Sequence, residues 1–213
     1  MTKIEAIKTL MTTYNGIINW QIIYNEIEKY YPDAKKSSNW QAGLRGVLYR
    51  EMKKGTIKRV DDGVYALVDY DITNMLPEEY KNDLITEKNV IVKVRTLQQQ
   101  FRKELLKNLK MCPITLVSDK RLLYASHIKP WCLSDSFEKL DTNNGFILSP
   151  LYDVLFDKGL ITFSNKKELV LSAKLKKETA EKLQIKEKVY ENLPICGREN
   201  YLDFHREKIF LTG

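Results

Sequence analysis

The chain of 213 residues is poor in the residues that mark several large classes of protein. Its three cysteines, Cys112, Cys132 and Cys196, are too few and too scattered for a disulfide framework or a four-cysteine zinc site. No apolar run approaches the roughly 18 residues that a membrane-spanning helix needs. The opening stretch MTKIEAIKTL contains Glu5 and has amphipathic spacing, unlike a secretory signal. These absences predict a cytoplasmic protein with no membrane segment and with buried, reduced thiols.

What the chain does have is positive charge. Thirty-five Lys and Arg residues stand against 28 Asp and Glu residues, which gives a formal net charge of +7. Hydrophobic residues make up 43% of the chain and charged residues 30%, the balance of an ordinary globular protein. The length suffices for one large domain or two small ones. The excess of positive charge favours a polyanionic partner.

Residues 1–68 carry apolar side chains at helical spacing in three consecutive segments. Residues that cap or stop helices separate the segments. The expected boundaries are a first helix that ends at Asn15-Gly16, a second from about Trp20 to Pro32-Asp33, and a third from the cap candidates at 37–39 to Gly55.

The segment IKRVDDGVYALV then supplies two β-prone runs around Asp62-Gly63, the dipeptide favoured in a type I′ hairpin turn. Three helices followed by a hairpin resemble a winged helix, over residues 1–68. The resemblance implies that the third helix enters the major groove of DNA, although a solvated face or a protein contact would suit the same composition. The expected DNA contacts are Lys35, Lys36, Arg45, Arg50, Lys53, Lys54, Lys58 and Arg59.

Residues 69–91 lose this periodicity and turn acidic, so we expect a linker with a helical turn or two. Beyond it, VRTLQQQFRKELLKNLK predicts a helix. The runs MCPITLV and Leu122–Ser126 predict a hairpin around Ser118-Asp119-Lys120, with His127 at the end of the return strand. After the irregular loop CLSDSFEKLDTNNG, a short apolar strand leads to a helix that starts at Ser149-Pro150 and stops at Gly159.

Four polar residues fall at fixed places in this order of elements: His127 at a strand end, Asn144 in the loop, and Asp153 and Asp157 on the helix. The two aspartates are four residues apart and therefore share one face of the helix. A neutral imidazole can take a proton from water, and carboxylate oxygens suit a hard cation that offsets charge on a phosphate. The loop carboxamide can tie strand and helix together, and Asn143 is an alternative to Asn144 for that task.

The segments FRKELL, MCPIT, ASHIKPW, LDTNNGFILSPLYDVLFDKGLITF and YLDFHREKIF together resemble the HNH endonucleases of the ββα-metal fold. More specifically, they resemble the HNH domains of bacterial restriction endonucleases. The resemblance covers residues 92–213. It implies that His127 is the general base, Asn144 the structural asparagine and Asp153 a metal ligand. Asp157 is implied either as a second ligand or as a support of the fold.

Two departures from the family pattern concern the metal. Many members have Asp or His immediately before the base, where this chain has Ser126, a weak ligand. The paired cysteines that bind structural zinc in many relatives are absent, so we expect Mg²⁺ or Mn²⁺ and no structural zinc. Arg95, Arg102 and Lys129 are further candidates for phosphate contact, and His205 is interpreted as structural or phosphate-contacting.

The sequence therefore predicts an α+β protein with a winged helix at 1–68, a linker at 69–91 and an HNH domain at 92–213. Its expected activity is metal-dependent hydrolysis of double-stranded DNA, as a type II-like restriction enzyme. Dependence on base modification and a homodimeric state stay open. The alternatives are a homing endonuclease, a DNA-binding regulator with an inactive HNH domain, and an RNA-cutting toxin.

Overall fold

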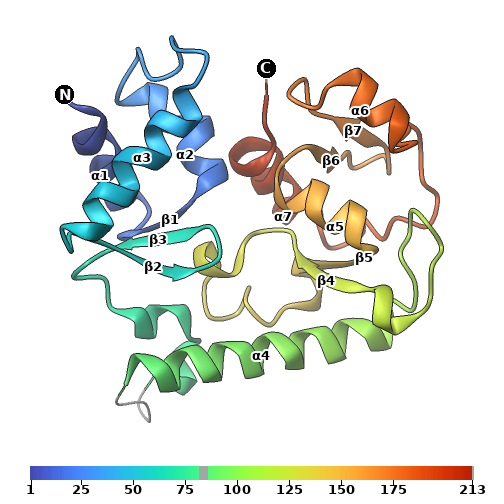
Figure 1. Ribbon diagram of the computed structural model, residues 1–213. Helices are drawn as coiled ribbons and strands as arrows, with labels where there is room; N and C mark the ends of the chain where they lie inside the picture. The colour runs from blue at the N-terminus through green and yellow to red at the C-terminus, as the bar shows by residue number, and fades with distance from the viewer. Residues whose placement is uncertain (82–85, 213) are drawn as a thin grey trace. The chain divides into compact units, whose positions relative to one another are not determined.

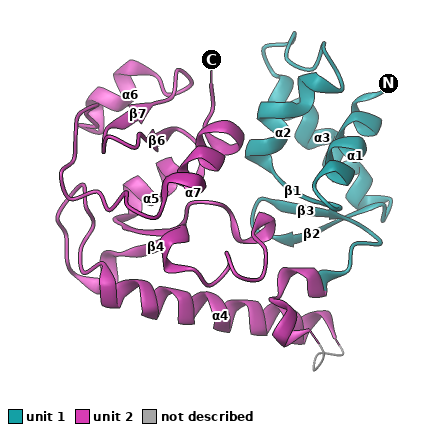
Figure 2. Cartoon of the chain, turned by 180° about the vertical axis from the view of Figure 1, so that it is seen from behind, with its two compact units in different colours: residues 1–72 teal, residues 73–213 magenta. Residues whose placement is uncertain are grey.

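The structure is a computed structural model that describes residues 1–81 and 86–212. It contains two compact units, residues 1–72 and residues 73–213 (Figure 2). Both mix helices with small antiparallel sheets, so the class is α+β, as predicted. Within the described ranges, no helix combines the length and the apolar character needed to cross a membrane.

Unit 1 has three helices and a three-stranded antiparallel sheet of order β1-β3-β2 (Figure 1). The helices and the hairpin lie where the sequence pattern predicted them, whereas the short first strand was not predicted. Its elements are α1 (Lys3–Thr13), β1 (Ile17–Asn19), α2 (Trp20–Glu26), the 3-10 turn Ile27–Lys29, α3 (Trp40–Lys53), β2 (Ile57–Asp61) and β3 (Val64–Leu67).

Local side-chain contacts explain where these helices begin. Thr2 caps α1 through a reciprocal pair of hydrogen bonds with Glu5. Asn19 ends β1 and also caps α2, because its Oδ1 accepts a hydrogen bond from the backbone N–H of Ile22 at 3.1 Å. Asn19 therefore belongs to both elements. The strand has only three residues, which is too short for an alternating pattern to reveal it in the sequence.

The β2–β3 hairpin turns at Asp62-Gly63 as predicted, but its turn is not type I′. That type needs a positive φ at both central residues, and only Gly63 of the pair has one, at 67°. The register also shifts between Arg59 and Asp61, which marks a bulge in β2. The added twist of the bulge replaces the twist that a type I′ turn would supply.

The described residues of unit 2 form a long helix, two two-stranded antiparallel sheets and three short helices. Figure 1 shows α4 running beneath the sheet that holds β4 and β5. The elements are α4 (Glu87–Asn108), β4 (Tyr124–His127), β5 (Gly145–Leu148), α5 (Pro150–Asp157), β6 (Ile161–Phe163), β7 (Leu169–Leu171), α6 (Lys177–Lys182), α7 (Glu199–Phe204), the π-helical turn His205–Ile209, and the 3-10 turns Ile72–Met75, Glu78–Tyr80, Lys120–Leu122, Trp131–Leu133 and Thr142–Asn144.

The expected hairpin between MCPITLV and the strand ending at His127 is wrong. β4 pairs instead with β5, in the register Ser126 to Phe146 and His127 to Gly145. The segment from Cys112 closes on itself, since the Cys112 N–H donates to the Val117 carbonyl at 2.9 Å. Pro113 also lacks the N–H that a strand would use.

The segment expected to be a linker, 69–91, holds two 3-10 turns and the start of α4. Residues 82–85 of it lie outside the described part of the chain. Met75 and Leu76 are buried, so this segment packs within unit 2 at least in part. The three domain ranges themselves stay a prediction.

Aromatic side chains fill the core of unit 2. Phe146, Phe156 and Phe163 contact one another with ring centroids 5.3–5.9 Å apart. Gly145 lets α4 approach β5 closely, because a Cβ at that position would lie 2.5 Å from Phe101 Cζ. Close packing of α4 on β5 therefore sets the surroundings of the residue paired with Gly145, which is His127.

Candidate active site

Consecutive residues of a strand point to opposite faces, and β4 uses this rule to separate its two functional candidates. Ser126 is buried and its Oγ donates a hydrogen bond to Asp153 Oδ1 on α5. His127 points toward α4, where its ring stacks on Phe101 with centroids 3.8 Å apart. The two sides of one strand thus carry a hydroxyl–carboxylate pair and an imidazole.

On the first side, α5 presents two carboxylates one helical turn apart, Asp153 and Asp157. Burial raises the pKa of Asp153, and the hydrogen bond from Ser126 opposes that change. Desolvation of its carboxyl, together with the negative charge of Asp153, raises the pKa of Asp157 to about 7. Asp157 as a residue is exposed, so water also reaches this end of α5. Burial and the charge of Asp153 destabilise the ionised form of Asp157. A bound cation would offset that negative charge, so the position suits one.

The ligand atoms available here are of the type that a hard divalent cation binds, but there are fewer of them than such a cation needs. Ser126, Asp153 and Asp157 offer oxygen atoms alone, the ligands that Mg²⁺ and Mn²⁺ prefer. Over residues 1–81 and 86–212, however, no three His, Cys, Asp or Glu side chains gather into a metal-binding group. A cation at this place would keep several water ligands.

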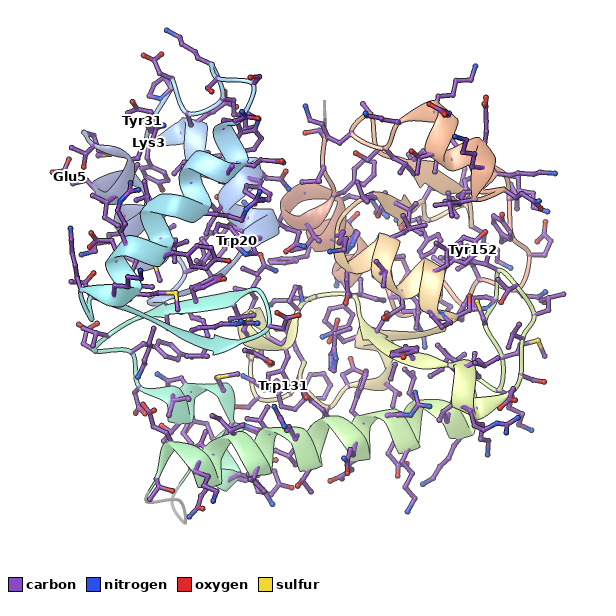
Figure 3. The ribbon with its side chains drawn as sticks, in the orientation of Figure 1. Lys3, Glu5, Trp20, Tyr31, Trp131 and Tyr152 are labelled. Carbon is purple, nitrogen blue, oxygen red and sulfur yellow. The ribbon has the colours of Figure 1, made fainter. Side chains whose placement is uncertain are left out.

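On the second side, His127 is enclosed by aromatic rings and a backbone carbonyl. Trp131, in the turn after β4 (Figure 3), meets the imidazole edge-on at 5.5 Å. His127 Nε2 lies 3.0 Å from the carbonyl oxygen of Lys139. A carbonyl accepts hydrogen bonds, so Nε2 carries the proton and Nδ1 keeps its lone pair. Burial lowers the pKa of His127 to about 4, against the opposing effect of the Lys139 carbonyl, and the ring is neutral at pH 7.

Asn144 holds together the loop from which Lys139 reaches the imidazole. Its Oδ1 accepts from the backbone N–H of Lys129 at 2.8 Å. Its Nδ2 donates to the carbonyl oxygens of Lys129 and Glu138, at 3.1 and 3.0 Å, and to Ser134 Oγ at 3.2 Å. Asn143 is exposed and makes none of these bonds. These hydrogen bonds of Asn144 therefore join the strand end to the loop, and none of them joins strand to helix.

A second set of bonds fixes the same loop from outside. The indole N–H of Trp131 donates to the Met75 carbonyl at 2.8 Å. The buried ammonium of Lys139 donates to the Ser134 carbonyl at 2.6 Å and to the Asn74 carbonyl at 3.4 Å. Sequence reasoning did not identify Phe101 and Lys139 as neighbours of the imidazole, or Met75 as the partner of Trp131. These contacts join residues that are 12 to 56 positions apart along the chain.

The predicted site residues therefore form two groups. Ser126 and Asp153 are in contact, with Asp157 one turn along α5. His127 and Asn144 belong to the loop side, where both bind backbone groups. Among the described interactions, none joins His127 to either aspartate. A phosphate that used both groups would have to reach across the end of β4.

The basic candidates of unit 2 differ in availability. Arg95 is exposed. Arg102 donates to the carbonyls of Leu123 and Lys120, so its guanidinium holds the segment that leads into β4. Lys129 forms an ion pair with Glu138 at 2.5 Å and lies over the ring of Phe204.

The basic candidates of unit 1 lie mainly on and around α3. Arg50 and Lys53 are exposed on that helix. Others already have partners, which are Glu28 for Lys35, Asp33 for Lys36, Tyr24 for Arg45, Glu51 for Lys54 and Asp62 for Arg59, while Lys58 is half-buried in β2. The ion pairs of Lys36 and Arg59 are exposed, and such pairs are weak and can exchange for phosphate. Arg45 instead donates to a tyrosine hydroxyl, and the Glu51 carboxylate that pairs with Lys54 is buried.

His205 is a buried structural side chain rather than a surface contact. It is 1% exposed and its ring stacks on Phe156 at 3.9 Å. Its Nδ1 lies 2.9 Å from Thr162 Oγ1 and its Nε2 lies 3.1 Å from the Phe156 carbonyl. No phosphate could reach a side chain enclosed on both edges and one face.

Comparison with known families identifies the central part of this unit. Residues 112–164 match the family model described as HNH endonuclease. The matched segment contains Ser126, His127, Asn144, Asp153 and Asp157. No curated protein matches the chain. The match covers less than half of the chain and supports an HNH nuclease domain at residues 112–164.

Proposed function

We propose that the chain is a type II-like restriction endonuclease, in which residues 92–213 hydrolyse double-stranded DNA and residues 1–68 bind it as a winged-helix-like domain. The hydrogen bond between Ser126 and Asp153 is the observation that carries this proposal. It joins the strand that ends in the only histidine of the matched segment to the helix that carries both candidate metal ligands. Strand, helix and imidazole are thus assembled around one end of β4.

His127 supplies the general base in this proposal. Its Nδ1 holds a free lone pair, since the Lys139 carbonyl fixes the proton on Nε2. Nδ1 takes a proton from a water molecule whose oxygen attacks phosphorus, and the ester oxygen on the far side leaves. A pKa of about 4 makes the free imidazole a weak base. The negative charge of a bound phosphate would raise that pKa toward the working pH.

Asp153, Asp157 and Ser126 are the proposed holders of the divalent cation, Mg²⁺ or Mn²⁺. When bound, the cation offsets negative charge on the phosphate and the leaving oxygen. Ser126 orients the Asp153 carboxylate through its hydrogen bond. Because serine brings no charge, we expect weak cation binding and a high metal requirement.

Unit 1 is the proposed reader of the duplex. Support comes from its order of three helices and a hairpin and from the exposed Arg50 and Lys53 of α3. Arg and Lys on an exposed helix can contact phosphates and base edges in the major groove. Further phosphate contacts are proposed for the other basic candidates of both units. In unit 1 these are Lys35, Lys36, Arg45, Lys54, Lys58 and Arg59, and in unit 2 they are Arg95, Arg102 and Lys129.

Plasmid digestion tests the proposal. Purified chain is incubated with methylated and unmethylated plasmid across a titration of Mg²⁺ and of Mn²⁺, and the product ends are sequenced. We expect metal-dependent cleavage at defined sites. Asp153→Asn should raise the metal requirement sharply or end cleavage, and Asp157→Asn should do as much if it is a second ligand. Cleavage by Asp153→Asn at the unmutated metal requirement would refute the metal assignment.

A regulator with an inactive HNH domain is the second candidate, favoured by Ser126 and by the enclosed imidazole of His127. It predicts binding of duplex DNA at low salt and no strand scission at any metal concentration. The plasmid assay therefore separates the two functions in one experiment.

A further inference from the structure

The carboxyl-terminal segment lies directly against the end of α5, the helix that carries Asp153 and Asp157. A Cβ at Gly159, just after α5, would lie 2.1 Å from the Ile209 carbonyl oxygen. The Leu211 N–H donates to the Gly159 carbonyl at 2.9 Å. Arg206 adds a bond to the Phe163 carbonyl at 2.7 Å. This segment therefore holds α5 and β6 together from outside.

Within the segment, His205 reaches the helix itself. Its Nε2 lies 3.1 Å from the Phe156 carbonyl, the peptide group immediately before Asp157. Carbonyls in the last turn of a helix lack intrahelical partners and need donors. The Gly159 N–H provides one donor to the Phe156 oxygen, at 2.8 Å, and His205 provides another. The stacked ring of Phe156, 3.9 Å away, fixes the same residue a second time.

The Phe156 carbonyl decides which ring nitrogen of His205 carries the proton, and Thr162 is the partner of the other nitrogen. Its hydroxyl, buried on β6, lies 2.9 Å from Nδ1. Since the Phe156 carbonyl can only accept, Nε2 is the protonated nitrogen and Nδ1 accepts from the threonine hydroxyl. Two bonds and one ring contact therefore leave the imidazole a single orientation.

The donor at this helix end is also neutral. Burial lowers the pKa of His205 to about 3. A lysine or arginine would satisfy the same carbonyl and is common at helix ends, but it would place a positive charge beside the two candidate ligands. Lys158 already places one positive charge near Asp157, and a buried neutral imidazole gives the hydrogen bond without adding another.

We propose that His205, oriented by Thr162, is a positioning residue for the metal centre: it fixes the end of α5 and thereby the separation of the Asp153 and Asp157 carboxylates. This inference rests on the proposed function, since it assumes that these aspartates hold the cation. Groups that orient metal ligands from behind commonly change metal affinity by about 10–100-fold when they are lost.

The test measures Mn²⁺ binding by calorimetry and thermal stability on the same purified full chains. His205→Phe keeps a ring stacked on Phe156 and removes both hydrogen bonds, whereas His205→Gln keeps a donor near the Nε2 position. We expect His205→Phe to weaken Mn²⁺ binding by about tenfold or more, and His205→Gln to stay within about threefold of the unmutated chain. Ala180→Gly, in α6, costs about 1 kcal/mol of stability and serves as the control, with unchanged Mn²⁺ affinity.

A second pair repeats the test without touching the histidine. Thr162→Val removes the hydroxyl at nearly constant volume and should weaken Mn²⁺ binding, and Thr162→Ser should restore it. This pair decides the question if His205→Phe does not fold. Unchanged Mn²⁺ affinity in folded Thr162→Val and His205→Phe would overturn the positioning role. If the unmutated chain bound Mn²⁺ and Asp153→Asn bound it equally well, the metal centre would be misplaced and this inference would fail with it.

Discussion

Replacing Asn144 by aspartate changes one atom and should break the loop that holds His127. The side chain is fully buried, and its Nδ2 donates to two backbone carbonyls and to Ser134 Oγ. In the aspartate, a negatively charged oxygen would face the carbonyl oxygens of Lys129 and Glu138. Each buried acceptor left without a donor costs about 1–3 kcal/mol, so two of them cost about 2–6 kcal/mol before charge repulsion.

Activity should fall together with stability, because Glu138 precedes the residue whose carbonyl orients the imidazole. A displacement of about 1 Å at such a group can cost on the order of 10²-fold in rate. Urea unfolding followed by circular dichroism gives the free energy, and a plasmid cleavage assay gives the rate.

Asn143→Asp is the matched control for Asn144→Asp. It makes the same change of charge one residue earlier, at an exposed position, and should alter the free energy of unfolding by less than about 0.5 kcal/mol. Lowering the pH should narrow the difference between the two variants, since protonation returns a donor to residue 144 and removes its charge. Equal stabilities of the two variants at pH 7 would refute the reasoning.

Three further predictions follow from the same structure. Gly145→Ala forces the Phe101 ring away from His127 and should cost about 1–3 kcal/mol by overpacking, measured by urea unfolding, with loss of cleavage. Between pH about 6.5 and 3 the unfolded chain binds a proton at His205 that the folded chain does not. As the pH is lowered through this range, the free energy of unfolding therefore decreases by at most about 1.4 kcal/mol per pH unit. The decrease should be less steep in His205→Gln. Arg50→Gln should reduce the slope of log K against log salt for DNA binding by about 0.9 in magnitude, and an unchanged slope would exclude that phosphate contact.

The sequence predicted what short-range chemistry decides. The pattern placed a helix start at about Trp20 and a helix stop at Gly159, and α2 and α5 begin and end accordingly, with Gly159 at a positive φ. The pairing of β4 was mispredicted, because a β-prone run such as MCPITLV does not reveal that its own N–H groups turn back locally. Strand partners depend on contacts between distant segments, which spacing alone does not encode.

The candidate site was predicted in part for the same reason. Asp153 and Asp157 share a helix face by periodicity alone, whereas the contact of Asp153 with Ser126 needs the fold. The alternation of a strand predicts that His127 and Ser126 point to opposite faces. It does not predict the partners of His127 on α4 and in the loop. Motif residues could thus be named from the sequence, and their physical surroundings could not.

The measurement that tests the central claim most directly is the single-turnover rate of plasmid cleavage by His127→Ala, with duplex binding measured on the same protein. If His127 is the base, the rate should fall by about 10²–10⁴-fold. DNA affinity should stay unchanged, because the imidazole acts on water and not on the duplex. Cleavage by His127→Ala at the unmutated rate would contradict the assignment of the base and the proposed mechanism.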